Sequence, residues 1–207
     1  TLLFPAFSKL DPEKDQETLK IVFQFSVKYA SLLVVPTTVL VMSLAEPAIS
    51  TIFNSEYSQA PLFLALLALG YVFTAFGSLS ISNLLNSQGQ TMYNLKLTIL
   101  TCVIGFPLGT VLILSFGVLG LILTTLVTGL PSVFISLNWI KRRYGVSLDW
   151  GSSAKILLSS ASAGVITYVI VSELSFASWI RLIIGVGIFV PTFVMTLLLT
   201  RTVNRNE

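Results

Sequence analysis

The chain has 207 residues, of which 54% are hydrophobic and only 10% are charged, and its mean hydropathy is +0.89. Soluble domains carry about 25% charged residues, so this composition excludes an ordinary soluble globule and indicates a polytopic membrane protein. The formal charge is +3, but the basic residues lie beside apolar segments, so we expect no nucleic-acid partner. There is no histidine and Cys102 is the single cysteine, so we expect no metal and no cofactor.

Six apolar segments are long enough to cross a bilayer, for which a helix needs about 20 mostly apolar residues. In chain order they are 21–44, 62–85, 95–116, 118–140, 156–171 with its small-residue flanks, and 180–200. The sequence therefore predicts an all-α fold with six transmembrane helices.

The segments between these spans carry recognisable helix and loop signals. Asp11-Pro12 pairs a good N-cap with a residue favoured at the first helical position, so we expect a helix to begin there and run into the first span. The stretch 46–57 has apolar residues at helical spacing but is too short to cross, which indicates an interfacial half-helix. The stretches 86–90, 116–117 and 143–151 are predicted loops.

The basic residues fall almost entirely on one side of the membrane when six spans alternate. One side receives Lys9, Lys14, Lys20, Lys28, Lys96, Lys141, Arg142, Arg143, Lys155, Arg201 and Arg205, and the other receives Arg181. Lys and Arg are retained on the cytoplasmic side, so we expect a multi-pass protein of the cell membrane with both ends of this chain cytoplasmic.

One face of the first span is polar. Gln24, Lys28, Ser31 and Thr38 follow one another at spacings of four, three and seven residues, which places them on one helix face. A charge inside a bilayer costs about 2.5–3.5 kcal/mol or more, which makes an intramembrane ionisable group a functional candidate. Either this stripe lines a hydrated cavity in which Lys28 meets an anionic group such as a lipid pyrophosphate, or Lys28 snorkels to the headgroups.

A second polar cluster occupies one half of the second span and the turn after it. Its members are Ser78, Ser80, Ser82, Asn83, Asn86, Ser87 and Gln88. Uncharged hydroxyls and amides suit the hydroxyls of a sugar, and they equally suit hydrogen bonds between helices. We take Asn83 and Asn86, together with the four residues of the first-span stripe, as the candidate cavity residues.

Four prolines interrupt apolar runs, at Pro36, Pro107, Pro131 and Pro191. A proline inside a helix removes one backbone hydrogen bond and bends the helix. Kinked helices favour a bundle that opens and closes over a static anchor, although prolines are common in spans for other reasons.

Three patches in fixed order resemble one family. The residues 3–10 (LFPAFSKL) resemble the end of the eighth helix in oligosaccharide flippases of the multidrug/oligosaccharidyl-lipid/polysaccharide exporter superfamily. The residues 46–60 resemble a loop of these flippases. The residues 116–120 (FGVLG) are similar to their turn between the eleventh and twelfth helices. Two positions depart from the family pattern, with Asn54 in place of a glycine and Leu121-Ile122 in place of small alanines.

The resemblance implies two six-helix lobes facing a central cavity, followed by a final helix pair. Residues 1–144 would be the carboxy-terminal lobe, from the end of helix eight to helix twelve, and 145–207 the terminal pair with a cytoplasmic tail. It also implies a transporter rather than an enzyme, which translocates a lipid-linked oligosaccharide by alternating access for polysaccharide or glycoprotein glycan synthesis. Its partners would be this substrate, membrane lipids and an amino-terminal lobe of the same protein, since the cavity lies between lobes.

Other functions stay open at this point. A cation-coupled multidrug exporter of the same superfamily commonly places an acidic residue in the membrane, whereas the six apolar cores here hold no Asp or Glu. A structural multispan protein without transport activity is the other alternative. A membrane-embedded enzyme acting on glycosyl lipids is disfavoured by the short outer loops and the lack of histidine.

Overall fold

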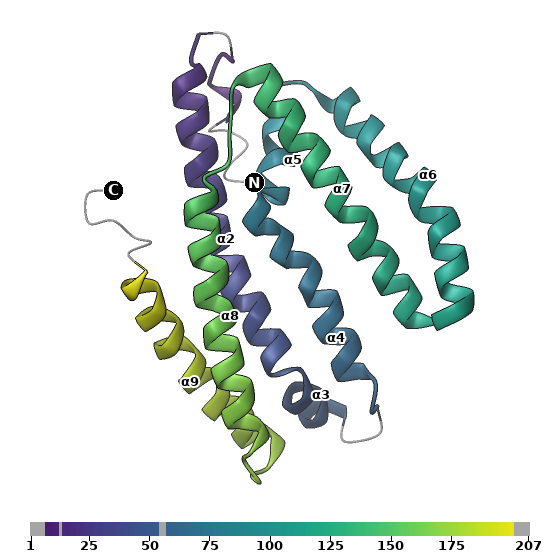
Figure 1. Cartoon of the computed structure of the whole chain (residues 1–207), viewed down its shortest axis with the longest axis vertical. Coiled ribbons are helices and arrows are strands. Elements are labelled where there is room, and N and C mark those ends of the chain that lie inside the picture. Colours follow the sequence, from purple (N-terminus) through teal and green to yellow (C-terminus); the bar gives the residue numbers. More distant parts are fainter. Residues whose placement is uncertain (1–6, 13, 54–56, 201–207) are drawn as a thin grey trace. The chain divides into compact units, whose positions relative to one another are not determined.

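The computed structural model describes residues 7–12, 14–53 and 57–200, and these residues form helices joined by turns, with no strand among them (Figure 1). The elements in chain order are α2 (Gln16–Ser43), α3 (Ala45–Phe53), α4 (Ala60–Leu69), the 3₁₀ helix η2 (Gly70–Phe76), α5 (Ser78–Ser87), α6 (Thr91–Phe116), α7 (Val118–Tyr144), α8 (Trp150–Ser172) and α9 (Ser178–Leu199). The all-α prediction is confirmed.

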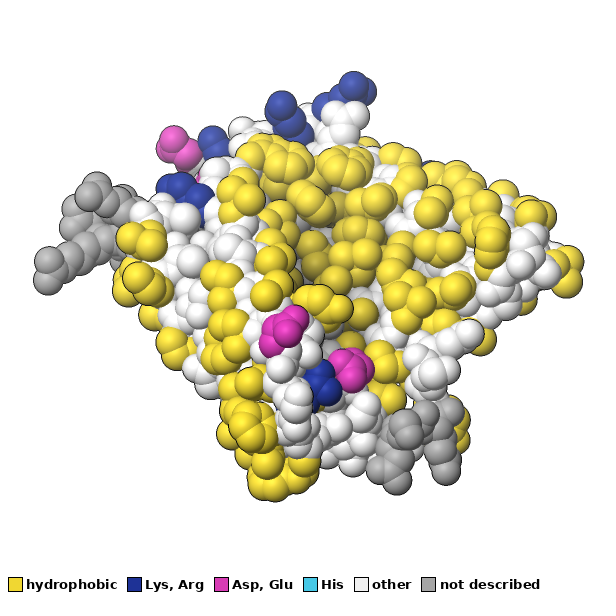
Figure 2. All heavy atoms as spheres, turned by 60° about the horizontal axis from the view of Figure 1, so that its bottom comes forward, with side chains coloured by type: hydrophobic (Ala, Val, Ile, Leu, Met, Phe, Trp, Pro, Cys, Tyr) yellow, Lys and Arg dark blue, Asp and Glu magenta, His cyan; other side chains and the backbone are white. Residues whose placement is uncertain are grey.

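The number of candidate membrane spans agrees with the sequence prediction. Within the described ranges, α2, α6, α7, α8 and α9 are each long and apolar enough to cross a bilayer, and the bent pair Ala60–Phe76 and Ser78–Ser87 is a sixth if it forms one span. Large hydrophobic side chains are widely exposed, including Phe106 at 81% and Leu114 at 84%, and Figure 2 shows one face on which hydrophobic side chains cover broad areas. Such a surface is stable against lipid and would aggregate in water.

The first long helix starts later than the sequence predicts. The residues around Asp11-Pro12 form a turn, closed by the amide of Asp15 donating to the carbonyl of Asp11 at 2.8 Å. The helix α2 begins at Gln16, and the carbonyl of Asp15 accepts from the amide of Leu19 at 2.8 Å. Asp15 therefore takes the cap position that the prediction gave to Asp11, because the turn uses the backbone of Asp11.

The predicted half-helix is present as α3, which has nine residues and ends at Phe53. Residues 54–56 of the second resemblance patch, which include Asn54, lie outside the described residues. Residues 3–6 of the first resemblance patch lie outside them as well. Phe7 and Ser8, the next residues of that patch, are helical and lead into the turn before α2.

The sharpest break within a predicted span lies at Gly77 and not at a proline. The segment runs from α4 through η2 to Gly77, which has φ +81°, and continues as α5 at an angle of 56°. By contrast, α2, α6, α7 and α9 each run continuously through the proline that they contain. A short 3₁₀ stretch inside a helix is typical of a hinge or of local strain.

The chain divides by its contacts into two compact units. The first consists of Thr1–Ser31 and Phe73–Trp150, and the second of Leu32–Val72 and Gly151–Glu207. The expected division into a lobe (1–144) and a terminal helix pair (145–207) follows the family's helix order and not the contacts within the chain. That division therefore stays a prediction.

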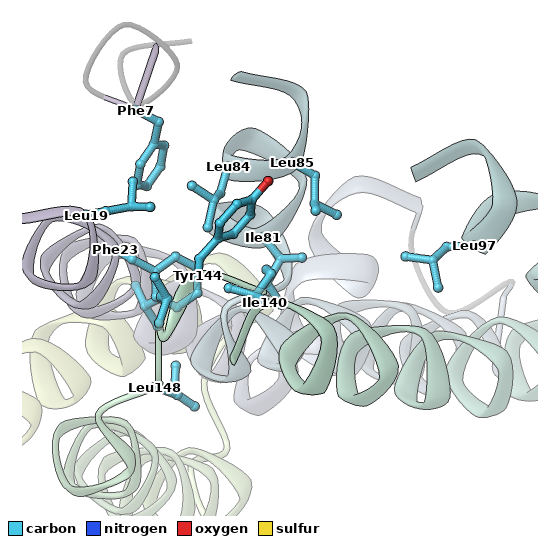
Figure 3. Close-up of a cluster of buried hydrophobic side chains, with 12 residues drawn as sticks. Phe7, Leu19, Phe23, Ile81, Leu84, Leu85, Leu97, Ile140, Tyr144 and Leu148 are labelled. Atoms are coloured by element: carbon cyan, nitrogen blue, oxygen red, sulfur yellow. The ribbon is translucent and has the colours of Figure 1, made fainter. Parts of the chain in front are cut away.

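The hydrophobic core of the first unit gathers side chains from the start of the chain, α2, α5 and the end of α7. Figure 3 shows Phe7, Leu19 and Phe23 beside Leu84 and Tyr144, all of them 4% exposed or less. Gly77 lies against this core, since a Cβ added there would lie 3.2 Å from a methyl of Val27. The break in the span is therefore fixed in place by packing.

Candidate functional site

Two residues of the predicted polar stripe hydrogen-bond to backbone carbonyls in the first unit. The side-chain amide of Gln24 donates to the carbonyl of Ser147 at 3.1 Å, in the stretch between α7 and α8. The hydroxyl of Ser31 donates to the carbonyl of Thr74 at 3.2 Å, and this carbonyl also accepts from the amide of Gly77 at 2.9 Å. Ser31 thus supports the backbone where the second span is broken.

The other two stripe residues have different surroundings. Lys28 is half-buried on α2, one turn before Ser31, and belongs to the first unit. Thr38 belongs to the second unit, where it lines an open groove of about 530 Å³ between α2 and α4 with Leu33, Leu64 and Tyr71. The walls of this groove are largely apolar and suit hydrocarbon, and its hydroxyl groups come from Thr37, Thr38 and Tyr71.

The polar cluster of the second span makes hydrogen bonds within the chain. Asn83 donates to the carbonyl of Leu79 at 2.9 Å, and Asn86 accepts through Oδ1 from the side-chain amide of Asn94 at 3.3 Å. The hydroxyls of Ser80 and Ser26 lie 2.7 Å apart, and both residues are buried. These bonds tie α5 to α2 and to the start of α6.

Gln88 connects the first resemblance patch to the polar cluster of the second span. Its side-chain amide donates to the carbonyl of Phe7 at 2.7 Å and to that of Leu10 at 3.1 Å. The first patch and the turn after the second span are therefore in contact, although about 80 residues separate them in the sequence.

The basic end of the α6–α7 hairpin carries aromatic rings beside exposed cations. The ring of Trp139 stacks on Tyr93 at a centroid distance of 4.2 Å and meets the edge of Tyr144 at 5.6 Å. Lys141, Arg142 and Arg143 follow in the last turn of α7 and are exposed. Amphipathic rings next to cations are typical of a segment at the membrane–water interface.

Sequence reasoning did not find the ion pair between Glu46 and Arg181. The guanidinium of Arg181 donates to both carboxylate oxygens of Glu46, at 3.3 and 3.0 Å, across 135 residues of sequence. Arg181 is the lone Lys or Arg on its predicted side of the membrane, and Glu46 lies in another loop of the same predicted side. These two predicted positions were the available signal for the pair.

The described ranges hold no candidate metal site. No group of three His, Cys, Asp or Glu residues in these ranges could hold a metal ion. The apolar candidate spans of the described ranges define a multi-pass membrane protein.

The comparison with family models places the chain in a flippase family. The model for the lipid II flippase MurJ matches residues 1–202, so the chain belongs to this family, whose members are transporters and not enzymes. The resemblance to flippases of the same exporter superfamily, drawn from the three patches, is thereby confirmed.

A curated relative supports the same class. The chain is 24% identical over 203 residues to the probable low-salt glycan biosynthesis flippase Agl15 of Haloferax volcanii. The match covers 94% of this chain and 42% of that protein, so the chain spans less than half the length of the relative it matches. No solved structure matches the chain.

Proposed function

We propose that the protein containing these residues translocates a lipid-linked glycan across the cell membrane by alternating access. The observation that carries this proposal is the match to the lipid II flippase family over residues 1–202, and the similarity to a glycan biosynthesis flippase supports it. The finer expectation is a lipid-linked oligosaccharide as substrate, for polysaccharide or glycoprotein glycan synthesis. In this proposal the chain is the carboxy-terminal part of a transporter whose cavity also needs an amino-terminal lobe.

The orientation belongs to the same proposal. Both ends of this chain lie on the cytoplasmic side, because eleven of the twelve Lys and Arg residues fall there when the spans alternate. The pairing of Glu46 with Arg181 then occupies the opposite side. A substrate whose anionic lipid headgroup starts on the cytoplasmic side would meet a cation-rich surface first.

Complementation tests the proposed function. The complete gene product is expressed in a strain depleted of its own lipid-linked glycan flippase, and we expect restored growth with normal glycan. Drug resistance without glycan rescue would overturn the proposal and favour a multidrug exporter.

The candidate cavity residues enter as proposed substrate contacts, with Lys28 as the group that meets the anionic headgroup. We expect Lys28→Gln to lower transport about tenfold, the factor that corresponds to about 1.4 kcal/mol, because it removes a charge-assisted bond. Lys28→Arg keeps the charge and should retain most of the transport.

The matched control is Lys20→Gln, which removes an exposed cation from the same helix. Transport is measured as surface exposure of the lipid-linked glycan, at matched levels of membrane protein. If Lys28→Gln transports as well as the control does, Lys28 serves only as an interfacial anchor.

A further inference from the structure

The second unit contains an ion pair that closes one end of a pocket. Arg181 lies in the first turn of α9, and its side chain is only 14% exposed, whereas the side chain of Glu46 is 58% exposed. The same guanidinium donates through Nε to the carbonyl of Val171 near the end of α8, at 3.2 Å. One side chain therefore holds three elements: α3, α8 and α9.

The packing of α9 brings the guanidinium to this place. Gly185 lies one turn after Arg181 on the same face of α9, and a Cβ added to it would clash with the side chain of Leu44 at the corner between α2 and α3. Phe189 continues this face and is buried. The close approach at Gly185 thus sets the distance at which Arg181 can reach Glu46.

The half-helix α3 packs against both α9 and α4, and the side chains that it buries are small. Its buried side chains are Ala45 and Pro47, both small, while Ile52 and Phe53 are exposed. Ala45 and Pro47 bury little apolar area, and the bonds to Arg181 add a polar link between the start of α3 and α9.

Beneath these residues lies a pocket of about 300 Å³. Glu46, Pro47 and Arg181 line it together with Ala65 of α4 and Tyr168 and Ser172 of α8. The ion pair joins the α3 side of this pocket to the α9 side. Breaking the pair would remove the polar link across this pocket between α3 and α9.

We propose that the Glu46–Arg181 pair is a latch that holds α3 over this pocket and controls access to it. The latch acts through two states of α3, one bound to Arg181 and one released. It is a conformational device of the second unit, and it goes beyond the proposed transport of a glycan.

Cysteine accessibility tests the latch directly. Ala65→Cys is introduced into the complete gene product after Cys102→Ser and replacement of any other cysteine, and its reaction rate with a maleimide is measured in lipid nanodiscs. We expect Glu46→Gln and Arg181→Gln each to raise that rate about two- to fivefold, the range that loss of a partly exposed ion pair gives. The exchanged pair Glu46→Arg with Arg181→Glu should restore most of the slow rate.

Controls separate the latch from unfolding and from a general effect of charge. Glu173→Gln neutralises an exposed carboxylate in the neighbouring α8–α9 turn and should leave the rate unchanged, and Ser58→Cys should react quickly in every background because it is exposed. Equal rates for Ala65→Cys in all backgrounds overturn the latch, as does an exchanged pair that reacts as fast as the single variants. The readout needs no transport, so failure of the proposed function leaves this result interpretable.

Discussion

A glycine and a hydroxyl group shape the break between η2 and α5 and keep its backbone hydrogen-bonded. At Gly77 the chain takes a φ of +81°, a conformation that L side chains rarely adopt, and the carbonyl of Thr74 accepts hydrogen bonds from both Gly77 and Ser31. Inside lipid an unsatisfied carbonyl costs several kcal/mol, and here the amide of Gly77 already satisfies the carbonyl of Thr74. The hydroxyl of Ser31 adds a second bond, which ties α2 to the break. Ser31, one of the candidate cavity residues, has this structural use.

Gly77→Ala is expected to destabilise the protein by about 1–2 kcal/mol, because the left-handed conformation is unfavourable for a residue with a Cβ. The added methyl would also press on Val27 at 3.2 Å. The measurement is the thermal midpoint of the detergent-solubilised protein.

Gly187→Ala is the matched control, since a Cβ there meets nothing within 4 Å and the residue is in the middle of α9. Alanine favours the helix by up to about 1 kcal/mol over glycine, so the control should be neutral or stabilising. Equal midpoints for the two variants would show that Gly77 does not need its positive φ.

At the scale of elements, the α6–α7 hairpin explains why one resemblance patch contains glycine twice. Gly117 turns the chain with φ +58°, and Gly120 in the first turn of α7 faces the backbone of α6 at Leu112. Farther along, Gly109 of α6 faces Thr124 of α7, where an added Cβ would lie 3.3 Å from the threonine methyl. Small residues let the two backbones approach closely, which is how helices gain packing energy in a bilayer.

Gly120→Ala should disrupt this hairpin, because its methyl would overlap the carbonyl group of Leu112, and a backbone atom cannot rotate away. Overpacking of this kind costs about 1–3 kcal/mol. Gly105→Ala is the control, since its methyl would lie 3.6 Å from Thr128 in ordinary contact. We expect a lower thermal midpoint and a lower yield of membrane-inserted protein for Gly120→Ala alone, and equal yields and midpoints would contradict the packing argument.

At the scale of the whole molecule, charge and hydropathy act together. The alternation of apolar spans fixes which loops share a side, and the distribution of Lys and Arg orients them. The family membership agrees with the multi-pass membrane class, and the orientation stays a prediction.

The predicted orientation can be measured by labelling with a membrane-impermeant maleimide. Thr91→Cys at the start of α6 and Ser175→Cys between α8 and α9 are both exposed positions. With Cys102→Ser and other cysteines replaced, Ser175→Cys should react in intact cells, whereas Thr91→Cys should react only after permeabilisation. The reverse pattern, or equal labelling of both, would reject the cytoplasmic placement of the basic side.

The sequence by itself determined the class of the protein, the candidate spans and the family, because hydropathy is a local property and a bilayer demands about 20 apolar residues per helix. The half-helix α3 and the hairpin turn at Gly117 were also readable, since each depends on neighbouring residues. The start of α2 was misplaced because Asp11 and Asp15 are both good caps, and the turn between them decided which one is used.

Only the tertiary structure decided what the polar residues touch. The contacting polar residues lie far apart in the sequence. The separation is 43 positions for Ser31 and Thr74, 54 for Ser26 and Ser80, and 135 for Glu46 and Arg181. The sequence shows each of these residues as polar in an apolar setting, which is compatible with a cavity and with packing alike. Hydrogen bonds and ion pairs depend on distances of about 3 Å between atoms of different elements, and the packing of the helices alone sets those distances.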